Sequence, residues 1–169
     1  MHTPPQGIEL RAFVPERDLP LVSSWLKLPH VSRWWGDPAD SEKAVREHQP
    51  RDSALICLDA VPKGYLCWQV PTRQELELVG LADLPADVVD IDIFIGELSA
   101  TGRGLGSEAL NQLCCDLRRN EVALAGIAAS PENAAACRAY EKAGFRCFRP
   151  FREAGQDWNY LTKALNAAA

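Results

Sequence analysis

A carboxylate inside an apolar segment is the first feature of this sequence that suggests chemistry. Asp92 lies within Ile91-Asp92-Ile93-Phe94-Ile95, where alternation predicts a β-strand. A charged side chain within such a strand is costly unless it faces a cleft or has a partner. Asp92 is therefore our first candidate for a general base. Asp90, two residues earlier, points to the same side of the strand. The alternative is that both carboxylates lie on a solvated face of the sheet.

A glycine-spaced turn follows this strand and opens directly into a helical pattern. Gly102, Gly104 and Gly106 allow the backbone to approach an anion closely. The first turn of the next helix would add unpaired N–H groups and a favourable dipole. A dinucleotide-binding turn would need a third glycine where Ser107 stands, and a P-loop would need Gly-Lys before Ser or Thr. The pattern therefore predicts a seat for a pyrophosphate, unless it is a plain turn at a helix start.

A second motif, Asn133 to Phe145, predicts a helix that carries a tyrosine. Ser130-Pro131-Glu132 is typical of an N-cap, a proline in the first helical position and an early acid, and Gly144 is typical of a C-cap. Tyr140 lies seven residues after Asn133, so both share one face of the helix. The alternative is that Tyr140 is a half-buried aromatic residue bonded to backbone.

The two motifs together resemble the signatures of the GCN5-related N-acetyltransferase (GNAT) superfamily. This resemblance implies a co-substrate, acetyl-CoA, whose pyrophosphate binds the glycine turn and whose sulfur faces Tyr140, and it implies no metal. The residues implied to bind the cofactor are Ile93, Phe94, Ile95, Gly102, Arg103, Gly104, Leu105, Gly106, Ser107, Asn133, Ala136 and Tyr140. The catalytic residues implied are Asp92 and Tyr140.

Acids and paired tryptophans suggest the acceptor. Residues 71–97 contain seven acids and one base, a negative field that suits a polycationic amine. Trp34 and Trp35, with Asp37 beside them, could stack on sugar rings and bind an ammonium group. A solvated acidic loop and core packing of at least one tryptophan are the alternatives.

The H-x-x-x-W-W-G loop, the Ile-Asp strand and the G-x-G-L-G turn narrow the resemblance to aminoglycoside 6′-N-acetyltransferases, from about Leu10 to the last strand. Asp92 then corresponds to the aspartate near the 6′-amine, Glu77 to an acid of the acceptor segment and Trp35 to an aromatic residue at the rim. Two positions depart from the pattern: Thr101 begins the turn, and Ala128-Ala129 replaces an acid. Glu153 and Asp157 could compensate for that acid. The implied substrate-binding residues are Trp34, Trp35, Asp37, Glu77, Asp90, Asp92, Glu153 and Asp157.

We therefore expect acetyl transfer from acetyl-CoA to a primary amine of an aminoglycoside, by direct attack in a ternary complex. The resemblance implies that this is the 6′-amine and that the reaction confers antibiotic resistance. Two alternatives stay open. The acceptor could be another amine, such as a hydroxylysine-type siderophore precursor, a polyamine or a protein N-terminus. The chain could also be an idle CoA-binding module.

Composition limits the classes of partner. The net charge of −5 argues against nucleic acid, and the apolar runs are too short to span a bilayer. The N-terminus lacks the pattern of a signal peptide, so we expect a cytoplasmic protein that is a monomer or a homodimer. Six cysteines without a C-x-x-C pair indicate free thiols.

At 169 residues the chain fits one domain, which we expect over 8–165 with loose termini at 1–7 and 166–169. The fold class expected is α/β: a single GNAT domain whose mixed central sheet has helices on both faces. Among its parts we expect an irregular loop over 30–40, a hairpin turn at 62–64, an irregular segment over 71–87, a strand over 89–95 and a helix from 105.

Overall fold

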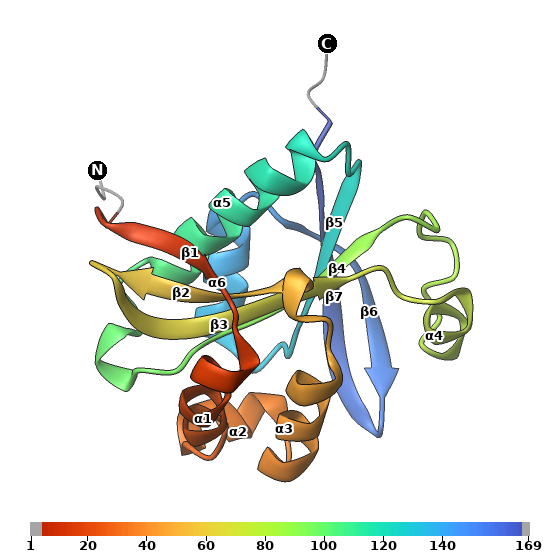
Figure 1. Cartoon of the computed structure of the whole chain (residues 1–169). Coiled ribbons are helices and arrows are strands. Elements are labelled where there is room, and N and C mark those ends of the chain that lie inside the picture. The colour runs from red at the N-terminus through yellow and green to blue at the C-terminus, as the bar shows by residue number, and fades with distance from the viewer. Residues whose placement is uncertain (1–4, 167–169) are drawn as a thin grey trace. The chain divides into compact units, whose positions relative to one another are not determined.

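The computed structural model, drawn in Figure 1, describes residues 5–166. The chain divides into two compact units. The first comprises the chain up to Cys67 and Ile93–Ala109, and the second comprises Trp68–Asp92 and the chain from Leu110 onward. Residues 1–4 and 167–169, most of the termini expected to be loose, lie outside the described residues. The expectation of one domain over 8–165 stays a prediction.

The first unit is built from three strands, three helices and a short 3₁₀ turn before the chain leaves it. In chain order these are β1 (Ile8–Ala12), α1 (Pro15–Leu26), α2 (Pro29–Trp35), α3 (Pro38–Glu47), η1 (Pro50–Asp52), β2 (Ser53–Leu58) and β3 (Val61–Gln69). The chain returns to it in β4 (Val89–Ile95), then η2 (Leu98–Ala100) and the start of α5 (Leu105–Arg119). β1 pairs antiparallel with β2, and β2 with β3.

Aromatic and aliphatic side chains join the three helices to one face of these strands. Trp25 of α1 and Phe94 of β4 meet edge to face, with ring centroids 6.2 Å apart. Trp35, at the end of α2, meets Phe94 in the same way at 4.9 Å. The buried members of this core are Phe13, Val22, Trp25, Leu26, Val31, Val45, Leu55, Cys57, Tyr65, Cys67 and Phe94.

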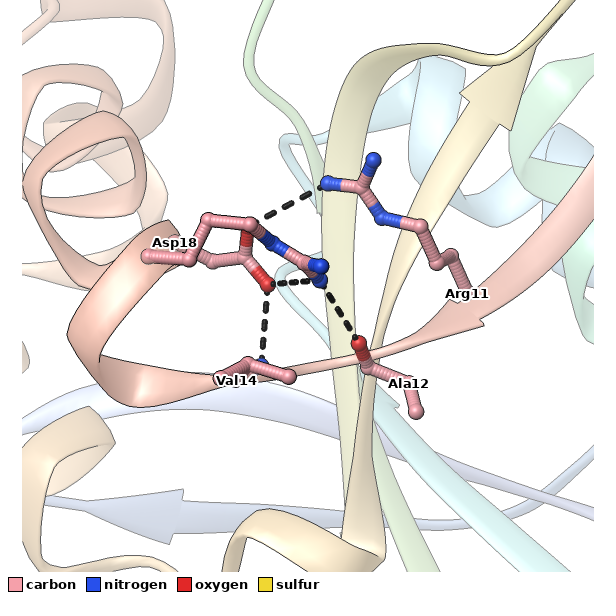
Figure 2. A network of polar contacts seen from close by, with 5 residues as sticks. Arg11, Ala12, Val14 and Asp18 are labelled. Atoms are coloured by element: carbon pink, nitrogen blue, oxygen red, sulfur yellow. Dashed lines mark hydrogen bonds and ion pairs between the residues drawn. The ribbon is translucent and has the colours of Figure 1, made fainter.

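A buried carboxylate fixes the beginning of α1 (Figure 2). Asp18 accepts hydrogen bonds from the backbone N–H of Val14 at 2.9 Å and from the guanidinium of Arg17 at 2.8 and 2.9 Å. Arg11 of β1 donates to the same carboxylate at 3.2 Å. The hydrogen bonds from Arg17 are the main reason that the pKa of Asp18 lies below its usual range. The network therefore ties α1 to β1.

The second unit carries α4 (Arg73–Leu78), β5 (Leu124–Ala129), α6 (Ala134–Lys142), β6 (Arg146–Glu153) and β7 (Gln156–Ala164). Within it the strand order is β4-β5-β7-β6. β4 runs parallel to β5, whereas β7 runs antiparallel to both β5 and β6. The sheet is therefore mixed, as expected. Its apolar side packs on the segment after α4 through Leu76, Leu81, Leu84, Val88 and Tyr160.

Two local expectations were wrong, and a third missed a short helix. The region 30–40 is largely helical, because Pro29 and Pro38 each occupy a first helical position and Asp37 caps α3. The hairpin turn lies at Asp59-Ala60, where both residues have positive φ, so 62–64 belongs to β3. The segment 71–87 contains α4, which begins with a capping box between Thr72 and Glu75.

Candidate functional site

The strand expected over 89–95 is confirmed as β4, and its pairing with β5 is short. Registered parallel pairs join Val89 to Ala125, Asp90 to Gly126 and Ile91 to Ile127. Asp92 is the first residue of β4 beyond the last of these pairs, and its side chain is exposed while Ile91 is fully buried. The carboxylate of Asp92 therefore lies on the accessible face of the strand, at the point where the ladder ends.

Asp90 lies on the same face and is held by a tyrosine. The hydroxyl of Tyr160 in β7 donates to Asp90 Oδ1 at 3.0 Å. Gly126 of β5 makes this contact possible, because a Cβ at that position would overlap the Tyr160 phenol. Tyr160 itself is buried, and burial raises its pKa, as does the nearby Asp90 carboxylate.

Other acids of the second unit lie within electrostatic range of Asp90. Burial is the main cause that raises the pKa of Asp90 well above its usual range, followed by the negative charge of Asp92. Glu75 of α4 and Glu153 of β6 act in the same direction, and the Tyr160 hydrogen bond partly offsets them. Four carboxyl groups from three elements therefore interact electrostatically, and one of them, Asp90, accepts a hydrogen bond from a buried phenol.

Tyr140, on α6, is buried within electrostatic range of Asp92. Burial raises the pKa of its hydroxyl, and the negative charge of Asp92 raises it further. The hydroxyl therefore keeps its proton at neutral pH. The two predicted catalytic residues, Asp92 on β4 and Tyr140 on α6, therefore interact electrostatically, which their spacing in the sequence alone did not establish.

The helix that carries Tyr140 begins and ends with recognisable caps. Asn133 is the N-cap, and its side chain accepts from the N–H of Ala136 at 3.2 Å. The expectation that Ser130 caps the helix was wrong, since Ser130 instead closes a turn by accepting from the N–H of Asn133. At the other end, Phe145 N–H donates to the Tyr140 carbonyl and Gly144 has φ of 94°, a Schellman ending.

The glycine turn belongs to the first unit and is shaped as expected. Gly102 and Gly104 have φ of 72° and 81°, in the left-handed region that favours glycine. The first hydrogen bond of α5 runs from Glu108 N–H to the Gly104 carbonyl, so the N–H groups of Leu105, Gly106 and Ser107 precede the helical ladder. Ser107 is buried and donates to the Gly104 carbonyl at 3.1 Å. Arg103 is exposed beside this turn.

The segment that leads into the turn is braced by α1 and α2. Trp25 Nε1 donates to Glu97 Oε1 at 3.0 Å, and a Cβ on Gly96 would overlap the Trp25 indole. The imidazole of His30 bonds to the Ile95 carbonyl at 3.1 Å. Ile93 and Phe94 are buried and Ile95 is partly exposed. These contacts fix the backbone between β4 and the glycine turn.

The remaining predicted acceptor residues have other contacts in this structure. Trp35 packs in the core of the first unit, and Trp34 lies under the guanidinium of Arg33 at 4.6 Å. Asp37 caps α3 by accepting from two backbone N–H groups. Glu77 and Asp157 form exposed ion pairs with Arg73 and Arg152 at 3.2 and 3.5 Å. Their roles in acceptor binding stay predictions.

Two residues that interact with Asp90 were not among the predicted site residues, although one of them, Glu75, belongs to the acidic segment 71–97. Glu75 belongs to the signature Thr-x-x-Glu of a capping box, which could have identified α4 and directed attention to this acid. Tyr160 lies in the predicted last strand, but only the pairing of β5 with β7 shows that its hydroxyl reaches Asp90.

Among residues 5–166, no helix is long and apolar enough to cross a membrane. That same part of the chain holds no group of three or more His, Cys, Asp or Glu side chains arranged for a metal ion.

Comparison with known proteins identifies the family. The model of the acetyltransferase (GNAT) domain matches residues 14–152, most of the chain. The chain belongs to the GNAT acetyltransferase family. The enzyme class expected from the motifs, N-acetyltransferase, and the expected α/β fold are thereby confirmed.

Relatives of this acetyltransferase include aminoglycoside enzymes. Aminoglycoside N(6′)-acetyltransferase type 1 of Klebsiella pneumoniae is 28% identical over 148 residues, which cover 77% of this chain and 70% of the relative. The solved structure of AAC(6′)-Ib with paromomycin and acetyl-CoA is 25% identical, with a TM-score of 0.74 and 94% of both chains covered. AAC(6′)-Ib with coenzyme A and kanamycin is 26% identical, with the same TM-score and 93% and 94% coverage.

Proposed function

We propose that this acetyltransferase transfers the acetyl group of acetyl-CoA to a primary amine of an aminoglycoside, at the 6′ position, and thereby confers resistance to the antibiotic. The observation that carries the proposal is the group of carboxyl side chains around Asp90, namely Asp92, Glu75 and Glu153. Such a group favours an acceptor with several ammonium groups. Relatives that are named for aminoglycoside acetylation and solved with aminoglycosides support the same acceptor class.

Asp92 is the general base in this proposal. An alkyl ammonium group has a pKa of about 10, so at neutral pH its deprotonation costs about 4 kcal/mol. A carboxylate on the accessible face of β4 can bind this ammonium group and take its proton, directly or through one water. The amine is then neutral and its lone pair is available for attack.

Tyr140 is the proton donor in this proposal. Its buried hydroxyl keeps a proton on Oη at neutral pH, because burial and the charge of Asp92 both raise its pKa. That proton is available for a departing thiolate, which would otherwise leave as a poorly stabilised anion. Asp92 and Tyr140 therefore divide the proton transfers between a base and an acid.

The glycine turn fits the pyrophosphate of acetyl-CoA. No atom lies within 4 Å of where a Cβ would stand on Gly102 or Gly106, so the backbone there is open to a ligand. The N–H groups at the start of α5 and the exposed Arg103 are donors suited to phosphate oxygens. Acetyl-CoA, when bound, supplies the acetyl group as an activated thioester. Ile93, Phe94 and Ile95, and separately Asn133 and Ala136, are proposed to hold its pantetheine arm.

The proposal is tested by release of free CoA thiol from acetyl-CoA in the presence of different amines. Kanamycin and tobramycin are compared with lysine, N-hydroxylysine, spermidine and a peptide N-terminus, for the wild type and Asp92→Asn. Turnover with the aminoglycosides that is lost in Asp92→Asn supports the proposal. Turnover with another amine alone would assign a different acceptor to the same chemistry. Tight CoA binding without turnover of any amine would indicate an idle binding module.

A further inference from the structure

Asp90 has no role in the mechanism above, yet its surroundings are unusually well organised. It lies two residues before Asp92 on the same face of β4, and its Oδ1 accepts a hydrogen bond of 3.0 Å from the Tyr160 hydroxyl. Gly126, its registered neighbour on β5, leaves the space through which the phenol reaches it.

We propose that Asp90, anchored by Tyr160, is a positioning residue that makes Asp90 and Asp92 act as one proton-accepting carboxyl pair. This inference rests on the proposed function. Two like charges on one face of a strand repel each other, and uptake of one proton relieves that repulsion. The pair with two negative charges therefore takes a proton from an ammonium group more readily than Asp92 would alone.

The proton transfer balances within the pair and the acceptor. One N–H bond of the ammonium group breaks, and its electron pair stays on nitrogen as the lone pair that attacks. One O–H bond forms on the carboxyl pair, and the charge of the pair changes from −2 to −1. The proton leaves to water once the product has gone, and no further reactant is needed.

The charged and titratable groups that face Asp90 come from three other elements and from its own strand. They are Asp92 on β4, Glu75 on α4, Glu153 on β6 and Tyr160 on β7. The acids favour a proton on the pair, whereas the Tyr160 hydrogen bond favours the charged form of Asp90. Removing Asp90 and removing the Tyr160 hydroxyl should therefore move the pH dependence of activity in opposite directions. A residue with only a structural role would move neither.

The test is the pH profile of kcat/KM for one acceptor at saturating acetyl-CoA. Asp90→Asn should lower kcat about tenfold and move the acidic limb of the profile to lower pH by about one unit, since Asp92 then titrates without its neighbour. Tyr160→Phe should move the same limb to higher pH, since Asp90 then keeps its proton longer. Asp90→Glu should restore part of kcat. Asp87→Asn, at an exposed acid three residues earlier, is the matched control and should leave the profile unchanged.

A second readout does not depend on turnover. Because burial and like charge raise the pKa of Asp90 in the folded protein, wild-type stability should fall as pH rises above about 4, the ordinary range of aspartate. The Tm of Asp90→Asn should therefore gain on that of the wild type as pH rises, with Asp90→Ser as a second variant if the first folds poorly. If Asp90→Asn and Tyr160→Phe are both active and the acidic limb of neither profile moves, Asp90 and Asp92 do not act as a pair. That result would leave the proposed function intact. Failure to acetylate any amine would overturn both.

Discussion

Trp25 on α1 donates a hydrogen bond from Nε1 to Glu97 Oε1 at 3.0 Å, across 72 positions of sequence. Trp25 is almost fully buried, and the lack of a side chain on Gly96 lets its indole lie against the backbone between β4 and the glycine turn. The helix thus fixes the segment that leads into the proposed pyrophosphate seat, although no part of Trp25 belongs to that seat.

Replacing Trp25 by Phe should therefore weaken acetyl-CoA binding more than it weakens catalysis. Loss of this hydrogen bond to a charged group costs about 1–2 kcal/mol, which corresponds to a rise in the KM for acetyl-CoA of about tenfold. Steady-state kinetics with acetyl-CoA varied would measure it, beside Lys27→Gln as an exposed control on the end of the same helix. An unchanged KM with normal folding would show that the brace does not position the turn.

Gly104→Ala should weaken binding of CoA but not of pantetheine, which lacks the pyrophosphate. Alanine at φ of 81° costs about 1 kcal/mol in backbone strain and distorts the turn that offers its N–H groups. Gly80→Ala is the matched control, because Gly80 has a similar φ of 74° and has open space at its Cβ position. Calorimetric titration separates the cases: equal losses for both ligands, or equal losses in both variants, would contradict a pyrophosphate seat at Gly104.

Tyr140→Phe should lower kcat by about 10²-fold with little change in either KM, because it removes a proton donor and keeps the ring. The raised pKa of Tyr140 predicts that wild-type activity does not fall through loss of the tyrosine proton near its ordinary pKa of about 10. Rates measured from pH 7 to 10.5 would check both statements. A variant with wild-type kcat would remove Tyr140 from the mechanism.

Asp18→Asn should destabilise the fold by about 2 kcal/mol, because a charged acceptor is lost from a buried network while both arginines remain. The pKa of Asp18 is lowered in the folded protein, chiefly by Arg17. Its stabilising contribution is therefore present above the ordinary pKa of about 4 and is lost as pH falls through the lower folded value. Urea unfolding from pH 3 to 7 should show a gap between wild type and variant that closes toward acid, whereas Asp116→Asn at an exposed site should show none. A gap independent of pH would contradict a role for the charge.

β4 could be predicted to the residue, because apolar and acidic residues alternate from Val89 to Ile93 and Gly96 follows the apolar run. The end of α6 at Gly144 could also be predicted, because the glycine after the helical pattern is a signal within the local sequence. The turn expected at 62–64 failed because Pro62-Lys63-Gly64 looks like a turn, while Gly64 is needed for a close approach of the Phe94 carbonyl. The neighbouring sequence does not distinguish a glycine that is required by a tertiary contact from a glycine that is required by a turn.

The site divides in the same way. The glycine turn, Asp92 and Tyr140 follow from spacing within single elements, so their placement on a turn, a strand and a helix was predictable. The contact between Tyr160 and Asp90 depends on the register of three strands and on the missing side chain of Gly126. No pattern within one element carries that information. Asp37 was predicted to bind the acceptor, and in this structure its side chain caps α3. The residue before Pro38 was therefore also a local signal of a helix start.

The most direct test of the proposed function is the structure of the product formed from kanamycin and acetyl-CoA. Mass spectrometry would count the acetyl groups added, and NMR would locate them on the sugar rings. A single acetyl group on the 6′ nitrogen, formed by the wild type and not by Asp92→Asn, is the predicted result. An acetyl group on another nitrogen, or kanamycin recovered unchanged while a different amine is acetylated, would contradict it.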